Sequence, residues 1–176
     1  AWDLSNYAQV LHKFLNKIEI DPYAIIGHSN GGALAIHAVA RGKVKPQKLI
    51  LLSSSGVRDT QSLRRLGIKA VAKIGKIMTF WMPPSSRHKL QKALYGTVGS
   101  DMFAAEQLRE TFKLTVRQDI QKDASQLTLP TLLIYGSQDK ATPIDEIGQK
   151  LHALIKDSKL EIIYGADHFA HQEHAH

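Results

Sequence analysis

The sequence contains no cysteine, which excludes disulfide bonds and zinc sites built from thiolates. No apolar run approaches the roughly 20 residues that cross a bilayer, so the sequence gives no sign of a transmembrane helix. No signal peptide is visible, although the chain begins at Ala1 rather than methionine, which leaves a missing leader open. Together these absences favour a reducing compartment, and we expect a cytoplasmic location.

Composition indicates a globular protein. Of the 176 residues, 43% are hydrophobic, enough for one domain with a sizeable core. The net charge is +7, and residues 56–126 carry the whole excess, with thirteen basic and six acidic side chains. This uneven charge indicates either a solvated helix face or contact with an anionic surface. We expect no nucleic-acid partner.

Short apolar runs alternate with helical patterns along most of the chain. The runs are apolar throughout, as in strands covered on both faces, and lie at residues 23–26, 48–53, 131–135 and 160–164. Apolar residues recur at helical spacing over residues 3–18 (with Asp3 or Ser5 as cap), 33–40 and 144–155. The alternation predicts an α/β fold with a parallel sheet of about four strands and right-handed crossovers.

Residues 56–126 break this alternation. They contain no convincing strand but predict one helix over 63–78, with five basic residues beside its apolar stripe, and another over 100–121. We interpret 56–126 as a helical cap inserted into a core formed by 1–55 and 127–176. The basic helix predicts weak contact with an anionic or lipid surface, the alternative being a solvated face. Phe80, Trp81 and Met82 are expected to pack within the cap or to line a substrate pocket.

A Gly-x-Ser-x-Gly pattern lies between the first predicted strand and the following helix, the context of a nucleophile elbow. In such a sharp turn Ser29 is exposed at the carboxyl edge of the sheet, and Gly27 and Gly31 are expected to remove side chains that would clash. The backbone N–H of Asn30 begins the helix and would face a developing oxyanion. His28 is expected to point to the other face of the strand, in a structural role.

A carboxylate and a histidine follow two later strands at the same edge of the sheet. Asp139 follows the run at 131–135, and His168 follows the run at 160–164. The rival acid Asp145 is interpreted as a helix cap, and Asp167 as a solvated or local turn residue. Two other histidines, His171 and His174, are three residues apart, but nearby carboxylate and cysteine partners are lacking, so we expect no metal site.

The order serine, aspartate, histidine resembles the α/β-hydrolase fold family, in its lid-bearing esterase and C–C-bond hydrolase branch. The resemblance rests on Gly-His-Ser-Asn-Gly-Gly at 27–32, Pro-Thr-Leu-Leu-Ile-Tyr-Gly-Ser-Gln-Asp at 130–139 and Gly-Ala-Asp-His-Phe at 165–169. It implies Ser29 as nucleophile, His168 as general base and acid, and Asp139 as the group that orients the histidine, with no cofactor or metal. It covers the whole chain at fold level, loosely in the cap.

One departure from the family concerns the start of the chain. Family members place strands ahead of the nucleophile strand, and a loop there supplies the second oxyanion donor, whereas this sequence starts in a helix. We therefore expect the C-terminal part of a longer hydrolase, cut at both ends, with the nucleophile strand left as an exposed edge. Such a chain is expected to self-associate and to be at least about a hundredfold less active than a longer enzyme.

The resemblance predicts a serine hydrolase that cleaves a small carboxylic ester through an acyl-enzyme. The same three residues also serve C–C-bond cleavage of diketones and hydrolysis of lactones or thioesters, so the bond stays open. The alternative belongs to another class of function: a non-catalytic binding module that kept the fold and uses its basic cap. The sequence does not indicate an oligomeric state.

Overall fold

The computed structural model describes residues 1–58 and 108–173. The chain divides into two compact units, one formed by Ala1–Arg58 with Glu110–His176 and the other by Asp59–Arg109. The predicted helix over 63–78, the aromatic residues at 80–82 and most of the expected cap lie outside the described residues. They stay predictions. Among the helices that are described, none is long and apolar enough to cross a membrane.

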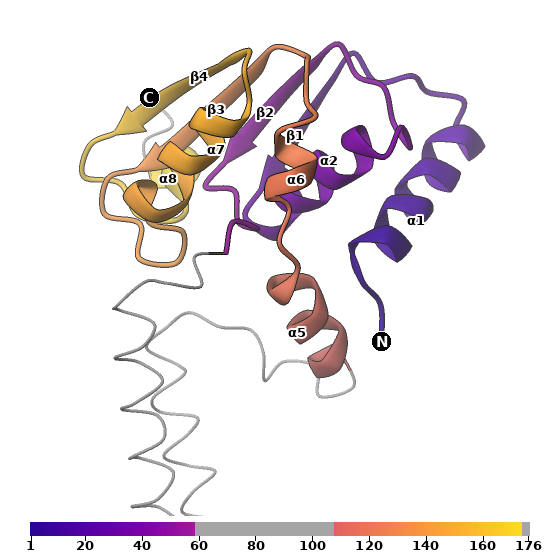
Figure 1. Ribbon diagram of the computed structural model, residues 1–176, viewed down its shortest axis with the longest axis horizontal. Helices are drawn as coiled ribbons and strands as arrows, with labels where there is room; N and C mark the ends of the chain where they lie inside the picture. Colours follow the sequence, from indigo (N-terminus) through magenta and orange to yellow (C-terminus); the bar gives the residue numbers. More distant parts are fainter. Residues whose placement is uncertain (59–107, 174–176) are drawn as a thin grey trace, which may run out of the picture. The chain divides into compact units, whose positions relative to one another are not determined.

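The sheet has four parallel strands in the order β1-β2-β3-β4 (Figure 1). Their bounds shift by no more than two residues from the apolar runs in the sequence: β1 (Ala24–His28), β2 (Lys48–Leu52), β3 (Thr131–Gly136) and β4 (Ser158–Ile163). This confirms the parallel α/β prediction. Because the strands are parallel and in register, the turns after all four of them come together at one edge.

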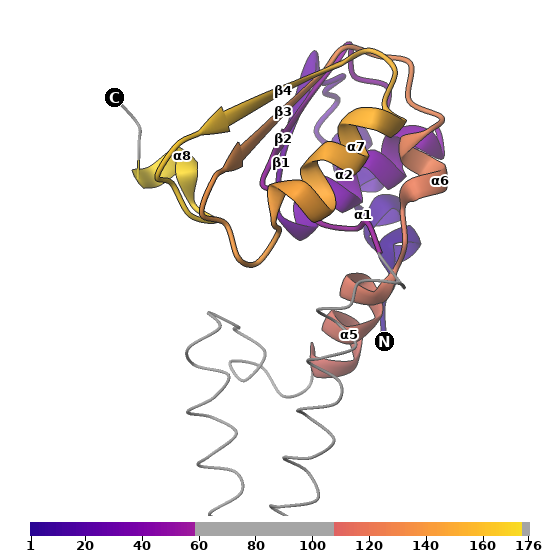
Figure 2. The same ribbon diagram turned by 60° about the vertical axis from the view of Figure 1, so that its left-hand side comes forward.

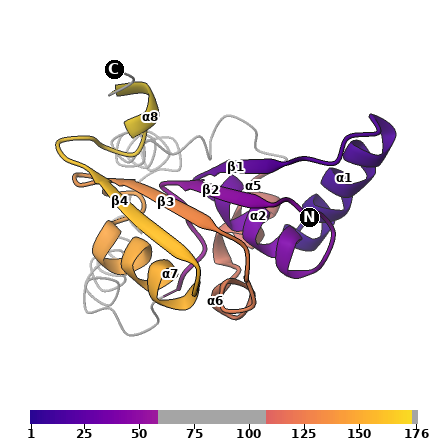
Figure 3. The same ribbon diagram turned by 90° about the horizontal axis from the view of Figure 1, so that it is seen from above.

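Helices cover one face of this sheet. The described helices are α1 (Leu4–Lys17), α2 (Asn30–Ala40), α5 (Arg109–Arg117), α6 (Gln121–Ala124), α7 (Gln149–Leu154) and α8 (Ala170–Glu173). Figures 2 and 3 show α2, α6 and α7 on the same side of the strands, with α1 beyond α2, whereas α8 lies on the opposite side. The core therefore forms between the sheet and α2, α6 and α7.

Local sequence explains where these helices begin. Asp3 caps α1: its carboxylate accepts the N–H of Asn6 at 2.9 Å, and the Asn6 side chain accepts the N–H of Asp3 at 3.0 Å. The cap is therefore Asp3 and not Ser5. The helix predicted over 144–155 starts as a π-helical turn, η3 (Ile144–Gly148), and continues as α7.

The helix predicted over 100–121 is broken within its described part. It is present as α5, but residues 118–120 are not helical, and α6 starts only at Gln121. The N–H of Ile120 donates to the carbonyl oxygen of Gly56 at 2.9 Å, and the Gln121 side-chain amide donates to the carbonyl oxygen of Arg58 at 3.2 Å. These bonds hold the segment before residue 59 against the segment after residue 117, which ends the helix.

The strands were expected to be covered on both faces, and this is wrong for the described residues. Leu51 and Leu133 are fully buried under the helices, whereas Ile26 is 63% exposed and Ile162 is 38% exposed. The reason is that the only described helix on that side of the sheet is the four-residue α8. The described structure thus leaves apolar side chains of β1 and β4 in contact with solvent.

The exposed edge of the sheet leads to a prediction on self-association. Within the described residues β1 pairs with β2 alone, so its other edge is free, and Ile26 beside that edge is exposed. We expect the 176-residue chain to self-associate, and Ile26→Lys to shift it toward monomer, because a charge on an edge strand opposes further pairing. Size-exclusion chromatography with light scattering would measure this, with Val10→Lys on α1 as control. A monodisperse wild-type monomer would contradict the prediction.

A polar network joins α1, α2 and α6 away from the carboxyl edge of the sheet. His37 Nδ1 lies 2.6 Å from Asp123 Oδ2, and its Nε2 lies 3.0 Å from Ser5 Oγ. His37 and Asp123 are buried, whereas Ser5 is exposed. Arg41 forms an ion pair with the other carboxylate oxygen at 3.0 Å. We interpret the network as a link between three helices. Its serine, histidine and carboxylate also serve as a control for the candidate active site.

Candidate active site

Ser29 occupies the turn between β1 and α2 in a conformation unusual for a residue with a side chain. Its φ is 53° and its ψ is −120°. Its N–H donates to the carbonyl oxygen of Leu52 at 2.9 Å, and its own carbonyl accepts from Gly32 and Ser55. The neighbouring strand and the first turn of α2 therefore hold this strained turn in place, as in a nucleophile elbow.

Two glycines make the turn possible, but they are not the two that the pattern suggests. A Cβ on Gly27 would lie 2.7 Å from the carbonyl oxygen of Gly31 and from Cα of Gly32, both backbone atoms. A Cβ on Gly31 would meet nothing within 4 Å, so the expected clash at this position is wrong. Gly32 has the packing role instead, because a Cβ there would overlap the Ser54 side chain.

The structure brings Ser29, His168 and Asp139 into one hydrogen-bonded array. Nε2 of His168 lies 3.0 Å from Ser29 Oγ, and its Nδ1 lies 2.8 Å from Asp139 Oδ2. The Asp139 side chain is completely buried, whereas that of His168 is 16% exposed. Because the carboxylate accepts only, Nδ1 carries the hydrogen, and Nε2 is left to accept from the serine hydroxyl.

Asp139 is held by more than the histidine. Its Oδ1 accepts the N–H groups of Ala141 and Thr142, each at 2.8 Å, and its Oδ2 lies 2.7 Å from the Thr142 hydroxyl. Burial alone would raise the pKa of the Asp139 carboxyl, but the bonds from His168 and Thr142 outweigh it and hold the pKa well below its ordinary value. The group therefore stays a carboxylate. Thr142 was not expected from the sequence.

Thr142 gives a prediction on pH and stability. Its hydroxyl favours the ionised form of Asp139, so its contribution to folding is present above about pH 4, the ordinary pKa of an unfolded aspartate, and falls as the pH falls below it. We expect Thr142→Val to lower the free energy of unfolding by about 1–2 kcal/mol at pH 7, with a smaller difference from wild type at pH 3. Urea unfolding at both pH values would measure this.

The matched control is Thr128→Val, because Thr128 is exposed. This substitution should change the free energy of unfolding by less than about 0.5 kcal/mol at either pH. An equal loss from Thr142→Val at pH 7 and pH 3 would show that the hydroxyl acts through packing and not through the carboxylate.

His28 lies against the histidine of the array, although strand alternation suggested that it points elsewhere. Its Nε2 is 3.0 Å from the main-chain carbonyl oxygen of His168, and the two ring centroids are 4.8 Å apart. Burial is the main cause that lowers the pKa of His28, and the nearby rings of His168 and His171 lower it further. His28 is therefore in contact with the site, which sequence reasoning missed.

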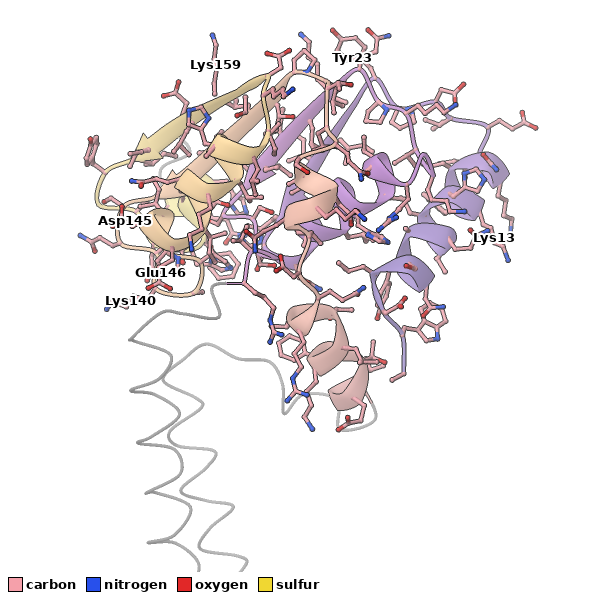
Figure 4. All side chains as sticks on the ribbon, in the orientation of Figure 1. Lys13, Tyr23, Lys140, Asp145, Glu146 and Lys159 are labelled. Atoms are coloured by element: carbon pink, nitrogen blue, oxygen red, sulfur yellow. The ribbon has the colours of Figure 1, made fainter. Side chains whose placement is uncertain are left out.

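The rival acids have other partners. The Asp145 carboxylate is exposed and accepts from the Gln149 side chain at 3.0 Å. Figure 4 shows Asp145 at the same end of the molecule as Lys140 and Glu146, opposite Tyr23 and Lys159. Its expected role as a helix cap is wrong, since Pro143 precedes η3. Asp167 makes a local contact, accepting the N–H of His168 at 2.8 Å.

Asn30 is the first residue of α2, so its N–H has no partner within the helix and lies at the positive end of the helix dipole. It sits directly after Ser29, where an oxyanion would form. No group of three or more histidine, aspartate or glutamate side chains in the described residues is placed to hold a metal. His171 lies on α8, whereas His174 falls outside the described residues.

A family model described as serine aminopeptidase, S33, matches residues 3–175. Two curated relatives are similar over most of the chain. The 2-hydroxy-6-oxononadienedioate/2-hydroxy-6-oxononatrienedioate hydrolase 1 of Pseudomonas putida is 25% identical over 96% of this chain. The pimeloyl-(acyl-carrier protein) methyl ester esterase of Neisseria meningitidis serogroup B is 27% identical over 88%. The chain spans 64% and 65% of the length of these relatives.

A solved structure shows the same fold. The α/β-hydrolase enzyme MGS-MChE2, from a sediment metagenome of the Mar Chica lagoon in Morocco, superposes with a TM-score of 0.62 at 24% identity. The match covers 98% of this chain and 64% of that structure. This likeness supports the fold.

Proposed function

This chain belongs to the serine aminopeptidase, S33, family of α/β hydrolases, and we propose that it contributes the catalytic residues of a serine hydrolase. The observation that carries the proposal is the unbroken set of hydrogen bonds from Ser29 through His168 to Asp139. A serine hydroxyl is a weak nucleophile until a base removes its proton, and His168 Nε2, 3.0 Å from Ser29 Oγ, would be that base.

In the proposed reaction Ser29 Oγ attacks the substrate carbonyl carbon, and its proton moves to His168 Nε2. The buried Asp139 carboxylate holds the imidazole in the required tautomer and stabilises the imidazolium. The Asn30 N–H donates to the oxyanion of the tetrahedral intermediate. The proton on His168 then passes to the leaving group, and water cleaves the acyl-enzyme by the same steps.

We propose a small carboxylic ester as the substrate, with no cofactor and no metal. The similarity to a methyl ester esterase supports this choice. A second candidate is hydrolysis of a C–C bond in a diketone-like acid, since the Pseudomonas putida relative is a 2-hydroxy-6-oxo-acid hydrolase. Contact of the basic segment over 63–78 with an anionic surface stays a separate proposal.

Two substrates separate these candidates. Hydrolysis of p-nitrophenyl butyrate releases p-nitrophenolate, and cleavage of a 2-hydroxy-6-oxo-dienoate bleaches its conjugated chromophore. We expect this chain to turn over the ester, at a rate that Ser29→Ala removes. Turnover of the dienoate alone would support the second candidate. Turnover of neither substrate, by a folded protein that also fails to react with a fluorophosphonate, would support a non-catalytic module.

A further inference from the structure

The residue directly before the nucleophile binds the main chain of the base. His28 ends β1, and its Nε2 lies 3.0 Å from the carbonyl oxygen of His168. A carbonyl oxygen only accepts, so Nε2 of His28 carries the hydrogen. This bond joins two parts of the chain that are 140 residues apart in the sequence.

The surroundings of the His28 ring hold it in one orientation. Its centroid lies 4.8 Å from that of His168, 5.1 Å from Phe169 and 4.9 Å from His171, all in tilted arrangements. These residues form the turn after β4 and the start of α8. The His28 ring thus packs against the same segment whose carbonyl group it binds.

We propose that His28 is a positioning residue, which couples the Ser29 turn to the His168 loop through the bond from its Nε2–H to the His168 carbonyl oxygen. This rests on the proposed function. With the His168 main chain fixed to the residue before Ser29, the imidazole Nε2 stays within hydrogen-bonding distance of Ser29 Oγ. Loss of the bond leaves the loop free to move the base away from the nucleophile.

The charge state of His28 matters as much as its position. The titratable groups that face it are His168 and His171, with the Asp139 carboxylate behind them. Burial lowers the pKa of His28, which favours the neutral ring, and a neutral ring donates from Nε2 without adding positive charge. A charged ring at this distance would oppose the imidazolium that His168 must form.

Two substitutions test the hydrogen bond apart from the packing. His28→Gln places an amide N–H near the position of Nε2, whereas His28→Phe keeps a ring but removes the donor. The readout is the rate at which a fluorophosphonate reacts with Ser29, forming a P–O bond as fluoride leaves and the proton passes to His168. We expect His28→Phe to react about tenfold more slowly and His28→Gln to stay within about threefold of wild type.

Equal rates for wild type and His28→Phe, or equal losses in both variants, would overturn the proposal. Thermal unfolding would show that both variants are folded. Nitrogen-15 NMR of the histidine rings tests the same inference without any reaction, even if wild-type Ser29 proves unreactive. We expect His28 as the neutral Nε2–H tautomer, and a change in the His168 ring signals in His28→Phe that His28→Gln does not produce. The Nδ1–H tautomer of His28, or unchanged His168 signals in His28→Phe, would also overturn it.

Discussion

Ser29→Ala should reduce hydrolysis of p-nitrophenyl acetate and butyrate by at least about a thousandfold, because the attacking atom is removed and residues of such an array act as a unit. His168→Ala should be nearly as damaging, because Ser29 Oγ then has no base at 3.0 Å. Ser29→Ala should change the thermal unfolding temperature little, whereas His168→Ala should lower it, because the buried Asp139 carboxylate then loses a hydrogen-bond partner. Initial rates with purified variants would measure both effects.

Ser5→Ala is the matched control for this experiment. Ser5 forms the same hydrogen bond to a histidine Nε2, at 3.0 Å, but the carboxylate behind His37 also pairs with Arg41 and the serine is not in a strained turn. Ser5→Ala should therefore leave turnover of the ester unchanged. Retention of more than about a tenth of wild-type kcat by Ser29→Ala would contradict the assignment, since loss of the nucleophile normally costs orders of magnitude.

The second large effect concerns the turn itself. Gly27→Ala should lower the free energy of unfolding by about 3 kcal/mol or more, because its Cβ would overlap backbone atoms that cannot move aside. Gly31→Ala should have the opposite effect and raise the free energy of unfolding by about 0.5–1 kcal/mol, since Gly31 lies within α2 with open space around its Cα.

Urea unfolding followed by circular dichroism would measure both substitutions under the same conditions. Each variant adds one methyl group, and the two sites are four residues apart, so Gly31→Ala controls for the added volume. Equal destabilisation by the two substitutions would show that the close approach at Gly27 does not limit the turn.

Much of the fold could be predicted because strands and helices leave local patterns. The apolar runs predicted all four strands, and Asp3 was one of two caps considered for α1. The break between α5 and α6 left no such pattern, because it depends on a bond from Ile120 to Gly56, which is distant in the sequence. The exposed face of the sheet was not predictable either, since coverage depends on which elements reach that face.

The site was predictable where residues follow directly from topology. Ser29, Asp139 and His168, which the structure brings together, were expected at one edge of the sheet from the Gly-x-Ser-x-Gly pattern, the family resemblance and their places after parallel strands. Thr142 was not expected, and His28 was expected to point away from the site, because the contacts of both depend on how two loops approach each other. The pattern named Gly31 and not Gly32, because the sequence does not show that Ser54 packs against Gly32.

We propose that Ser29 is the activated nucleophile of this chain. Treatment of the folded protein with a fluorophosphonate, followed by peptide mass mapping, tests it most directly. We expect a single adduct on Ser29, none on Ser5, and no adduct in Ser29→Ala or His168→Ala. A folded wild-type protein that carries no adduct, or one labelled equally in Ser29→Ala, would contradict it.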